Sequence, residues 1–137
     1  MAKSRRHARG LIDTSVIIDL GDIDPDDLPD ELAISVATMA ELAAGPHASS
    51  DPAERARRQD RLQRAEAHFD PLPVDGAVAR AYGRIYATVA AAGRKARGRR
   101  AFDLLIAATA LAAELPLYTR NPRDFQGLSD VLDIVVV

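Results

Sequence analysis

The chain has 137 residues, of which 47% are hydrophobic and 28% are charged, and its formal net charge is −2. This length and composition are typical of one soluble globular domain with its own core. The absence of cysteine excludes disulfide bonds and thiolate metal sites, and no apolar stretch is long enough to span a membrane. We therefore expect a cytoplasmic protein with no membrane partner.

The basic residues are grouped in the sequence. We therefore expect a local positive surface, although the net charge of the chain is slightly negative. They concentrate at residues 3–9, 55–64 and 94–100. We interpret residues 1–9 as a basic N-terminal tail and residues 10–137 as a single domain.

The first half of the chain predicts two strands and three helices. In chain order we expect a buried strand at residues 11–12, a short helix at 16–20, a proline-containing loop at 21–30, a strand at 32–37, a helix from 38 to 45 and a charged helix at 52–69. Ser50 or Asp51 is the expected N-cap of the charged helix.

The second half continues the alternation of strands and helices. We expect an edge strand at 72–74, a long helix ending at Gly93, a basic loop at 94–100, an apolar helix at 101–114, a strand at 116–119, a turn at 120–125 and a valine-rich strand at 133–137. This order predicts an α/β sandwich with a mainly parallel central sheet.

Three acidic residues are expected at the same edge of that sheet. Asp13 ends the first strand, Glu41 lies in the first turn of the helix after the second strand, and Asp124 follows the strand that ends at Thr119. Loops that follow parallel strands emerge at one edge, where α/β proteins place their sites. Asp103 follows no strand, so its place at this edge depends on the tertiary fold.

Three of the four acids also have a purely structural interpretation. Glu41 and Thr38 fit a capping box, Asp103 would interact favourably with the helix dipole, and Asp124 could stabilise a turn beside Asn121. However, Asp103 belongs to a strongly apolar helix, where an uncompensated carboxylate costs on the order of several kcal/mol. A shared cation would compensate it.

Four segments carry a family resemblance. They are Leu-Ile-Asp-Thr-Ser at residues 11–15, Ala-Glu-Leu at 40–42, Phe-Asp-Leu-Leu-Ile-Ala-Ala-Thr-Ala at 102–110 and Thr-Arg-Asn-Pro-Arg-Asp-Phe at 119–125. They resemble the PIN-domain family, and most closely its VapC-type ribonuclease toxins of bacterial toxin–antitoxin pairs. The resemblance implies a three-layer α/β/α fold, a Mg²⁺- or Mn²⁺-dependent endoribonuclease, a homodimer and a neutralising antitoxin partner.

The resemblance also implies roles for individual residues. Asp13, Glu41 and Asp103 match the family's three main acidic positions, which are catalytic and bind the metal. At the fourth position Asp124 supplies an acid, while Asn121 matches a polar position that would touch metal-bound water. Supporting roles in positioning carboxylates or water fall to Thr14 and Thr119, for which a surface or capping role is an equal alternative.

Oxygen ligands of this kind suit Mg²⁺ or Mn²⁺, and the three histidines are scattered without the spacing of a zinc site. The expected reaction is metal-assisted hydrolysis of an RNA phosphodiester bond. The basic loop ahead of Asp103 would hold the RNA backbone, although a solvated charge run is an equal interpretation. Its RNA-binding candidates are Arg94, Lys95, Arg97, Arg99 and Arg100. Scarce aromatic residues leave few platforms for stacking bases.

Two alternatives remain open at this stage. The chain could be a non-catalytic PIN-like interaction module whose acids only bind a basic partner, or a PIN nuclease that processes RNA without arresting growth. A phosphohydrolase with an aspartyl nucleophile is disfavoured, because Ser15 stands where that chemistry needs a second aspartate. A nucleotide-binding switch is disfavoured by the lack of a Walker loop.

Overall fold

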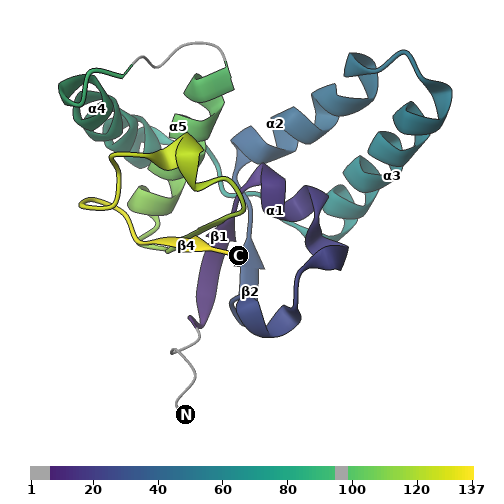
Figure 1. Cartoon of the computed structure of the whole chain (residues 1–137), viewed down its shortest axis with the longest axis horizontal. Helices are drawn as coiled ribbons and strands as arrows, with labels where there is room; N and C mark the ends of the chain where they lie inside the picture. Colours follow the sequence, from purple (N-terminus) through teal and green to yellow (C-terminus); the bar gives the residue numbers. More distant parts are fainter. Residues whose placement is uncertain (1–6, 95–98) are drawn as a thin grey trace.

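The computed structural model describes residues 7–94 and 99–137, except for the side chain of Arg99. Figure 1 shows its helices and strands. The strands are β1 (Arg9–Ile12), β2 (Glu31–Ala33), β3 (Leu117–Thr119) and β4 (Ile134–Val136). The α-helices are α1 (Thr14–Ile18), α2 (Val36–Ala44), α3 (Pro52–His68), α4 (Gly76–Ala91) and α5 (Arg99–Ala112), and short 3₁₀ turns are η1 (Leu20–Asp22), η2 (Pro25–Asp27), η3 (Gly45–Ala48) and η4 (Pro122–Phe125).

The four strands form one parallel sheet in the order β2-β1-β3-β4. The strand that comes first in the sequence therefore lies inside the sheet, between β2 and β3. All four strands end at the same edge, because they run in the same direction. The predicted α/β class with a parallel sheet is confirmed.

Alternate residues of the strands enter two separate cores. Leu11 and Leu117 belong to a core shared with α4 and α5, whereas Ile12 and Tyr118 belong to a core shared with α1 and α3. This follows from the strand geometry, in which neighbouring side chains point to opposite faces of the sheet. Figure 1 shows α4 and α5 together on one side and α2 and α3 on the other. The expected three-layer arrangement is confirmed.

The helices begin where polar side chains cap them. Asp51 accepts a hydrogen bond from the Glu54 backbone at the start of α3, so Asp51, not Ser50, is the N-cap. Asp75 caps α4 in the same way. At the other end of α4, Gly93 has a φ of +75°, a left-handed conformation that glycine adopts without steric cost.

Several predicted boundaries were wrong. The edge strand expected at residues 72–74 is a single bridge between Leu72 and Ser35, and the short helix expected at 16–20 is α1 at Thr14–Ile18. The strand expected at residues 32–37 ends at Ala33, because the Ser35 hydroxyl accepts a hydrogen bond from the Thr38 backbone and starts α2 at Val36. The apolar helix begins at Arg99, within the stretch predicted as a basic loop. Among the described residues, no helix combines the length and apolar character needed to cross a bilayer.

Gly10 is a position in β1 where the fold leaves no room for a side chain. A Cβ placed there would lie 2.6 Å from Cε1 of Tyr118 and 3.0 Å from Cγ of Pro29. Tyr118 is buried in the core and cannot swing away. We expect Gly10→Ala to lower the free energy of unfolding by about 1–3 kcal/mol through overpacking.

The control is Gly83→Ala in the middle of α4, where a new Cβ meets no atom within 4 Å. This change should stabilise the protein by about 0.5–1 kcal/mol, because alanine favours the helix over glycine. Urea unfolding of both variants measures the difference. Equal effects would show that Tyr118 and Pro29 do not enclose Gly10.

Candidate active site

Asp13 lies at the carboxyl end of β1 and caps the helix that follows it. Its Oδ1 accepts hydrogen bonds from the Val16 backbone at 3.1 Å and from the Ser15 hydroxyl at 2.6 Å. The residue is only 4% exposed. The chain thus holds one carboxylate in a fixed orientation below the surface.

The end of β3 holds the other oxygen of the same carboxylate. The Thr119 hydroxyl donates to Oδ2 of Asp13 at 2.5 Å and accepts a hydrogen bond from the Asn121 backbone at 2.9 Å. The Arg120 backbone donates to the Ser15 hydroxyl at 3.1 Å. Asp13 and the β3 loop are therefore joined by a continuous set of hydrogen bonds, at the sheet edge expected from the sequence.

Glu41 is connected to the Asp13 region through Thr14. The Thr14 hydroxyl lies 2.7 Å from Oε1 of Glu41 and 3.2 Å from the hydroxyl oxygen of Thr38. The capping-box interpretation was wrong, because Ser35 caps α2 and receives the Thr38 backbone N–H. Glu41 consequently lies in the second turn of the helix rather than the first, and its carboxylate accepts a hydrogen bond from α1.

Burial raises the pKa of the Asp13 carboxyl above its ordinary value. Hydrogen bonds from Ser15, Thr119 and the Val16 backbone oppose this shift, and the negative charge of Asp124 adds to it. Within the described part of the chain, no lysine or arginine forms an ion pair with Asp13.

Asp124 is half-buried in η4 and, together with residues 120–123, lines a cavity of about 490 Å³. The same cavity is lined by Asn121. The turn is held by the Asp124 backbone N–H, which donates to the Asn121 carbonyl at 3.0 Å. Two of the lining residues, Arg120 and Asn121, donate backbone hydrogen bonds to the Ser15 and Thr119 hydroxyls that hold Asp13.

Asp103 is half-buried in the first turns of α5, a helix that packs against both α2 and η4. These are the elements that carry Glu41 and Asp124. Across residues 7–94 and 99–137, however, no three or more acidic, histidine or cysteine side chains form a group that could hold a metal ion. Thr14, which follows Asp13 in the chain, bonds Glu41, and the charge of Asp124 acts on Asp13.

The predicted RNA-binding loop lies only partly in the described structure. Lys95 and Arg97 fall outside the described residues, as does the side chain of Arg99. Arg94 and Arg100 are half-buried. The Nη1 atom of Arg100 is buried and has no hydrogen-bond partner.

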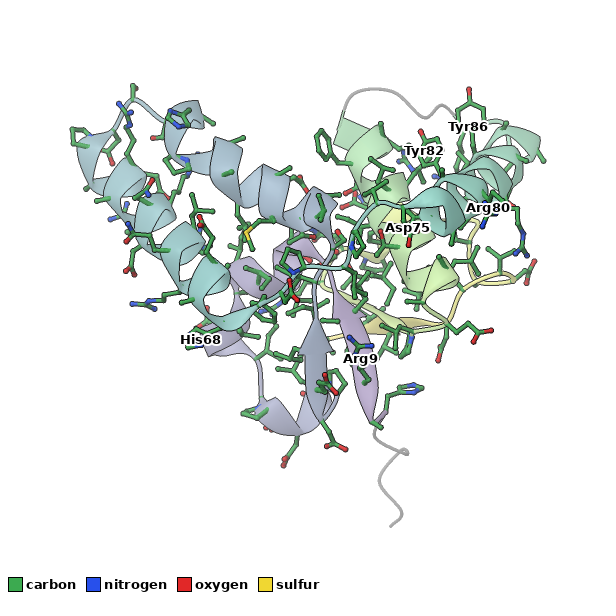
Figure 2. The ribbon with its side chains drawn as sticks, turned by 180° about the vertical axis from the view of Figure 1, so that it is seen from behind. Arg9, His68, Asp75, Arg80, Tyr82 and Tyr86 are labelled. Carbon is green, nitrogen blue, oxygen red and sulfur yellow. The ribbon has the colours of Figure 1, made fainter. Side chains whose placement is uncertain are left out.

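Aromatic residues are more accessible than the sequence suggested. Tyr86 is 49% exposed and Phe102 is 41% exposed. Figure 2 shows Tyr86 next to Tyr82 on α4, and their ring centroids are 6.3 Å apart. The expectation that few rings are available for stacking thus needs correction at these two positions.

Sequence reasoning missed Ser15, Ser35 and Thr38 as parts of this hydrogen-bond network. A signal was present, because hydroxyl residues directly follow the strands that end near Asp13 and Ile34. Which acid each hydroxyl contacts depends on how the strands are paired.

The raised pKa of Asp13 has a consequence for stability in metal-free buffer. The folded state holds the Asp13 proton more tightly than the unfolded chain does. Stability therefore falls as the pH rises from about 4, the ordinary range of an aspartate, through the raised folded-state pKa. We expect the stability of the wild type relative to Asp13→Asn to decline over this range, and denaturant unfolding with a chelator measures it. Parallel pH curves would contradict the raised pKa.

Comparison with known proteins places this geometry in a family. The PIN domain model matches residues 10–130. The chain is 35% identical to Ribonuclease VapC5 of Mycobacterium tuberculosis over 133 residues, covering 95% of each chain. It is 43% identical to Ribonuclease VapC8 of the same organism over 103 residues, covering 74% of this chain and 89% of the relative.

The fold is also similar to those of solved structures whose names belong to the same group as these relatives. The crystal structure of VapBC-5 from Mycobacterium tuberculosis, a member of the VapBC family of toxin-antitoxin systems, matches with a TM-score of 0.79 and 34% identity, covering 95% of this chain and 99% of that chain. VapBC-1 from nontypeable Haemophilus influenzae matches with a TM-score of 0.71 and 26% identity, covering 93% and 97%. The chain belongs to the PIN-domain family, and within it resembles the VapC ribonucleases.

Proposed function

We propose that this chain is a divalent-metal-dependent endoribonuclease that hydrolyses RNA phosphodiester bonds, and that it is the toxin of a toxin–antitoxin pair. The observation that carries the proposal is the buried Asp13 carboxylate, which the hydroxyls of Ser15 and Thr119 orient at the carboxyl ends of β1 and β3. The ribonuclease relatives support the reaction class, and the PIN family supports the site.

The donor set fits a hard divalent cation. Asp13 is a buried carboxylate without an ion pair from the described lysines and arginines, so a bound cation would offset the cost of its burial. In the described residues the four candidate acids are not already gathered in a group of three or more, so Mg²⁺ or Mn²⁺ would have to draw oxygens of Asp13, Glu41, Asp103 and Asp124 together as it binds. When bound, such an ion lowers the pKa of water and stabilises negative charge on the phosphate.

The chain's own residues fix the geometry for this chemistry. The Ser15 hydroxyl and the Val16 backbone N–H occupy Oδ1 of Asp13, whereas Oδ2 accepts from Thr119 and retains a second lone pair for a ligand. Thr14 holds Glu41 in a defined orientation. Asn121 borders the adjoining cavity and would touch bound water or the scissile phosphate.

Basic residues around the start of α5 would bind the RNA backbone. The buried Nη1 of Arg100 lacks a hydrogen-bond partner, and a phosphate oxygen is the acceptor that a guanidinium recognises best. Arg94, Lys95, Arg97 and Arg99, which precede Arg100 in the sequence, are the other candidates for such contacts. Such contacts add salt-dependent affinity but no choice of sequence.

The proposed partner is a cognate antitoxin. VapBC-5 is solved as a member of the VapBC family of toxin-antitoxin systems, and it matches nearly the whole of this chain. We also propose a homodimer, which the family resemblance implies. A role in RNA processing instead of growth arrest would involve the same active site.

The test is metal-dependent cleavage of RNA by the purified chain. Cleavage should require Mg²⁺ or Mn²⁺, stop on addition of a chelator and spare a DNA of the same sequence. Glu41→Gln and Asp103→Asn should each lower the rate by about a hundredfold or more, because each removes a charged ligand. Glu66→Gln, an exposed change on α3, is the control and should cleave normally.

The alternative function, a non-catalytic PIN-like interaction module, predicts a different result. If calorimetry detects no saturable Mn²⁺ binding and the chain cleaves no RNA, the acids serve only to bind a partner. Cleavage that persists in the chelator would also overturn the metal assignment.

A further inference from the structure

The cavity at η4 contains a positive charge that the proposed metal chemistry does not use. Its lining residues are Arg120, Asn121, Pro122, Arg123 and Asp124. Its volume of about 490 Å³ lies within the range of about 300–1,000 Å³ that is typical of sites for small ligands. The Arg120 backbone donates to the Ser15 hydroxyl, which in turn donates to Asp13. One wall of the cavity is therefore bonded to the candidate active site.

The two arginines of the lining differ in how their charge is used. Arg120 is half-buried, and its Nη1 lies 3.6 Å from Oδ2 of Asp19. Arg123 is exposed and forms no ion pair with any residue that the structure describes. The charge of Arg123 is thus left for a ligand.

The backbone that carries Arg123 is fixed on both sides. Phe125 is only 1% exposed and anchors η4 in the core. The Asp124 backbone N–H donates to the Asn121 carbonyl at 3.0 Å, and the Gln126 backbone N–H donates to the Arg123 carbonyl at 3.4 Å. Because the turn is already ordered, a ligand that binds the guanidinium has to immobilise little more than one side chain.

We propose that this cavity is a second phosphate subsite, in which Arg123 binds the phosphodiester group next to the scissile one. The inference rests on the proposed function, which places the scissile phosphate at a cation held in part by Asp124. Since Asp124 also lines the cavity, RNA bound at that cation has its neighbouring nucleotide at the cavity. A guanidinium binds two oxygens of one phosphate in parallel hydrogen bonds.

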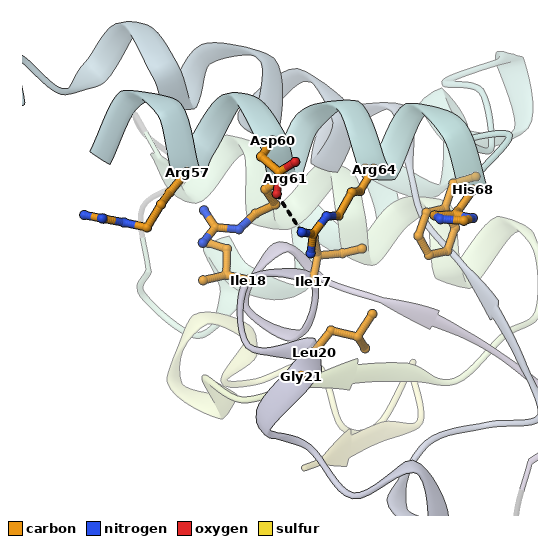
Figure 3. A pocket seen from close by; sticks show the side chains of 11 residues that line it. Ile17, Ile18, Leu20, Gly21, Arg57, Asp60, Arg61, Arg64 and His68 are labelled. Atoms are coloured by element: carbon orange, nitrogen blue, oxygen red, sulfur yellow. Dashed lines mark ion pairs between the residues drawn. The ribbon is translucent and has the colours of Figure 1, made fainter. Parts of the chain in front are cut away.

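A nucleic acid fits this cavity better than a protein segment does. Of the described residues that line it, only Pro122 is apolar, so an amphipathic peptide would bury little apolar surface there. The cavity between α1, η1 and α3 has the opposite chemistry, because Ile17, Ile18 and Leu20 form one of its walls (Figure 3). An RNA strand presents an anionic phosphate at every nucleotide step, which matches an unpaired arginine beside the site of cleavage.

Arg123→Gln tests the contact on RNA oligonucleotides with single neutral linkages. In these substrates a methylphosphonate replaces one phosphate at a time, on either side of the mapped cleavage site. For the wild type, one such replacement next to the scissile bond should lower kcat/KM at least about tenfold. For Arg123→Gln, kcat/KM on unmodified RNA should be lower by the same factor, and the same replacement should lower it less than about threefold further. The two changes remove one interaction, so their effects do not add.

Arg61→Gln is the matched control. Arg61 also forms no ion pair with the described residues, but it lines the other cavity, where Figure 3 shows it beside Ile18. Its kcat/KM should stay within about threefold of the wild type, and the neutral linkage should affect it as it affects the wild type. Arg123→Lys keeps the charge but loses the forked geometry, so its kcat/KM should lie between those of the wild type and Arg123→Gln. Arg123 is exposed, and all three variants should unfold at the same urea concentration as the wild type.

Binding measured in a chelator does not depend on cleavage. Fluorescence anisotropy with the unmodified oligonucleotide should show that Arg123→Gln binds at least about tenfold more weakly than the wild type. The slope of log affinity against log salt concentration should become shallower by about 1 in Arg123→Gln, because one phosphate contact is lost. Arg61→Gln should keep the slope of the wild type.

The outcomes separate this subsite from the proposed function. Equal effects of the neutral linkage on the wild type and Arg123→Gln would overturn the subsite, as would equal salt slopes of Arg123→Gln and Arg61→Gln. If Arg123→Gln binds RNA normally but binds the protein encoded beside this chain more weakly, the cavity belongs to a protein partner and the proposal is refuted. Arg123-dependent RNA binding in the chelator, without cleavage in Mg²⁺ or Mn²⁺, would refute the proposed function and leave a phosphate site at Arg123 standing.

Discussion

Asp13→Asn should abolish RNA cleavage while leaving the fold intact. Asparagine keeps an oxygen that accepts from the Val16 backbone and the Ser15 hydroxyl, and it is as good an N-cap as aspartate. Its amide can donate to Thr119, whose hydroxyl also accepts. The negative charge is lost, and with it the strongest interaction with a divalent cation. We expect the cleavage rate to fall by about a hundredfold or more.

The measurement pairs single-turnover cleavage with urea unfolding on the same preparation. The free energy of unfolding should stay within about 1 kcal/mol of the wild type, because the change removes a buried charge and keeps the cap. Calorimetry should show weaker Mn²⁺ binding. Undiminished cleavage by this variant would remove Asp13 from the active site, whatever its place in the fold.

Thr119→Val should impair both stability and catalysis. Valine has nearly the same shape, but it leaves Oδ2 of Asp13 and the backbone N–H of Asn121 without their hydroxyl partner. Thr119 is fully buried, so water does not readily replace that partner. The expected loss is about 1–3 kcal/mol in the free energy of unfolding.

Catalysis supplies a readout that a purely structural role of Thr119 would not change. The Thr119 hydroxyl lowers the pKa of Asp13, so its removal raises that pKa further. The acidic limb of the pH–rate profile should move to higher pH, because the carboxylate must be ionised to hold a cation.

The matched control is Thr109→Val in α5. Thr109 is equally buried, but its hydroxyl donates only to the Leu105 carbonyl one turn earlier in the same helix. That carbonyl retains its helical partner, so we expect a loss below about 1 kcal/mol and an unchanged pH profile. Identical behaviour of the two threonine variants would show that the Thr119 hydroxyl does not tune Asp13.

Much of the fold could be predicted because local signals were strong. The apolar run before Asp13, the N-cap at Asp51 and the glycine at the end of α4 each determine structure within a few residues. The parallel sheet followed from the alternation of strands with helices. Ser35 was the exception, since its hydroxyl ends the extended segment earlier than the apolar pattern indicates.

The contacts of the site could not be predicted in the same way. Thr14 meets Glu41 across 27 residues, and Thr119 meets Asp13 across 106. Such pairings are set by which strands lie next to each other, and the residue types alone do not encode strand order. The Thr38–Glu41 spacing matched a local motif, yet Glu41 instead binds a distant hydroxyl.

The place of β1 between β2 and β3 has a consequence for synthesis of the protein. Asp13 is made early, but the strand that contributes Thr119 is made near the end. A ribosome that has not yet reached residue 117, or that stalls there, carries a chain in which Asp13 lacks its hydrogen bond from Thr119. On the proposed function, a harmful activity would thus be absent from chains that lack β3, and would appear only after Thr119 has been made.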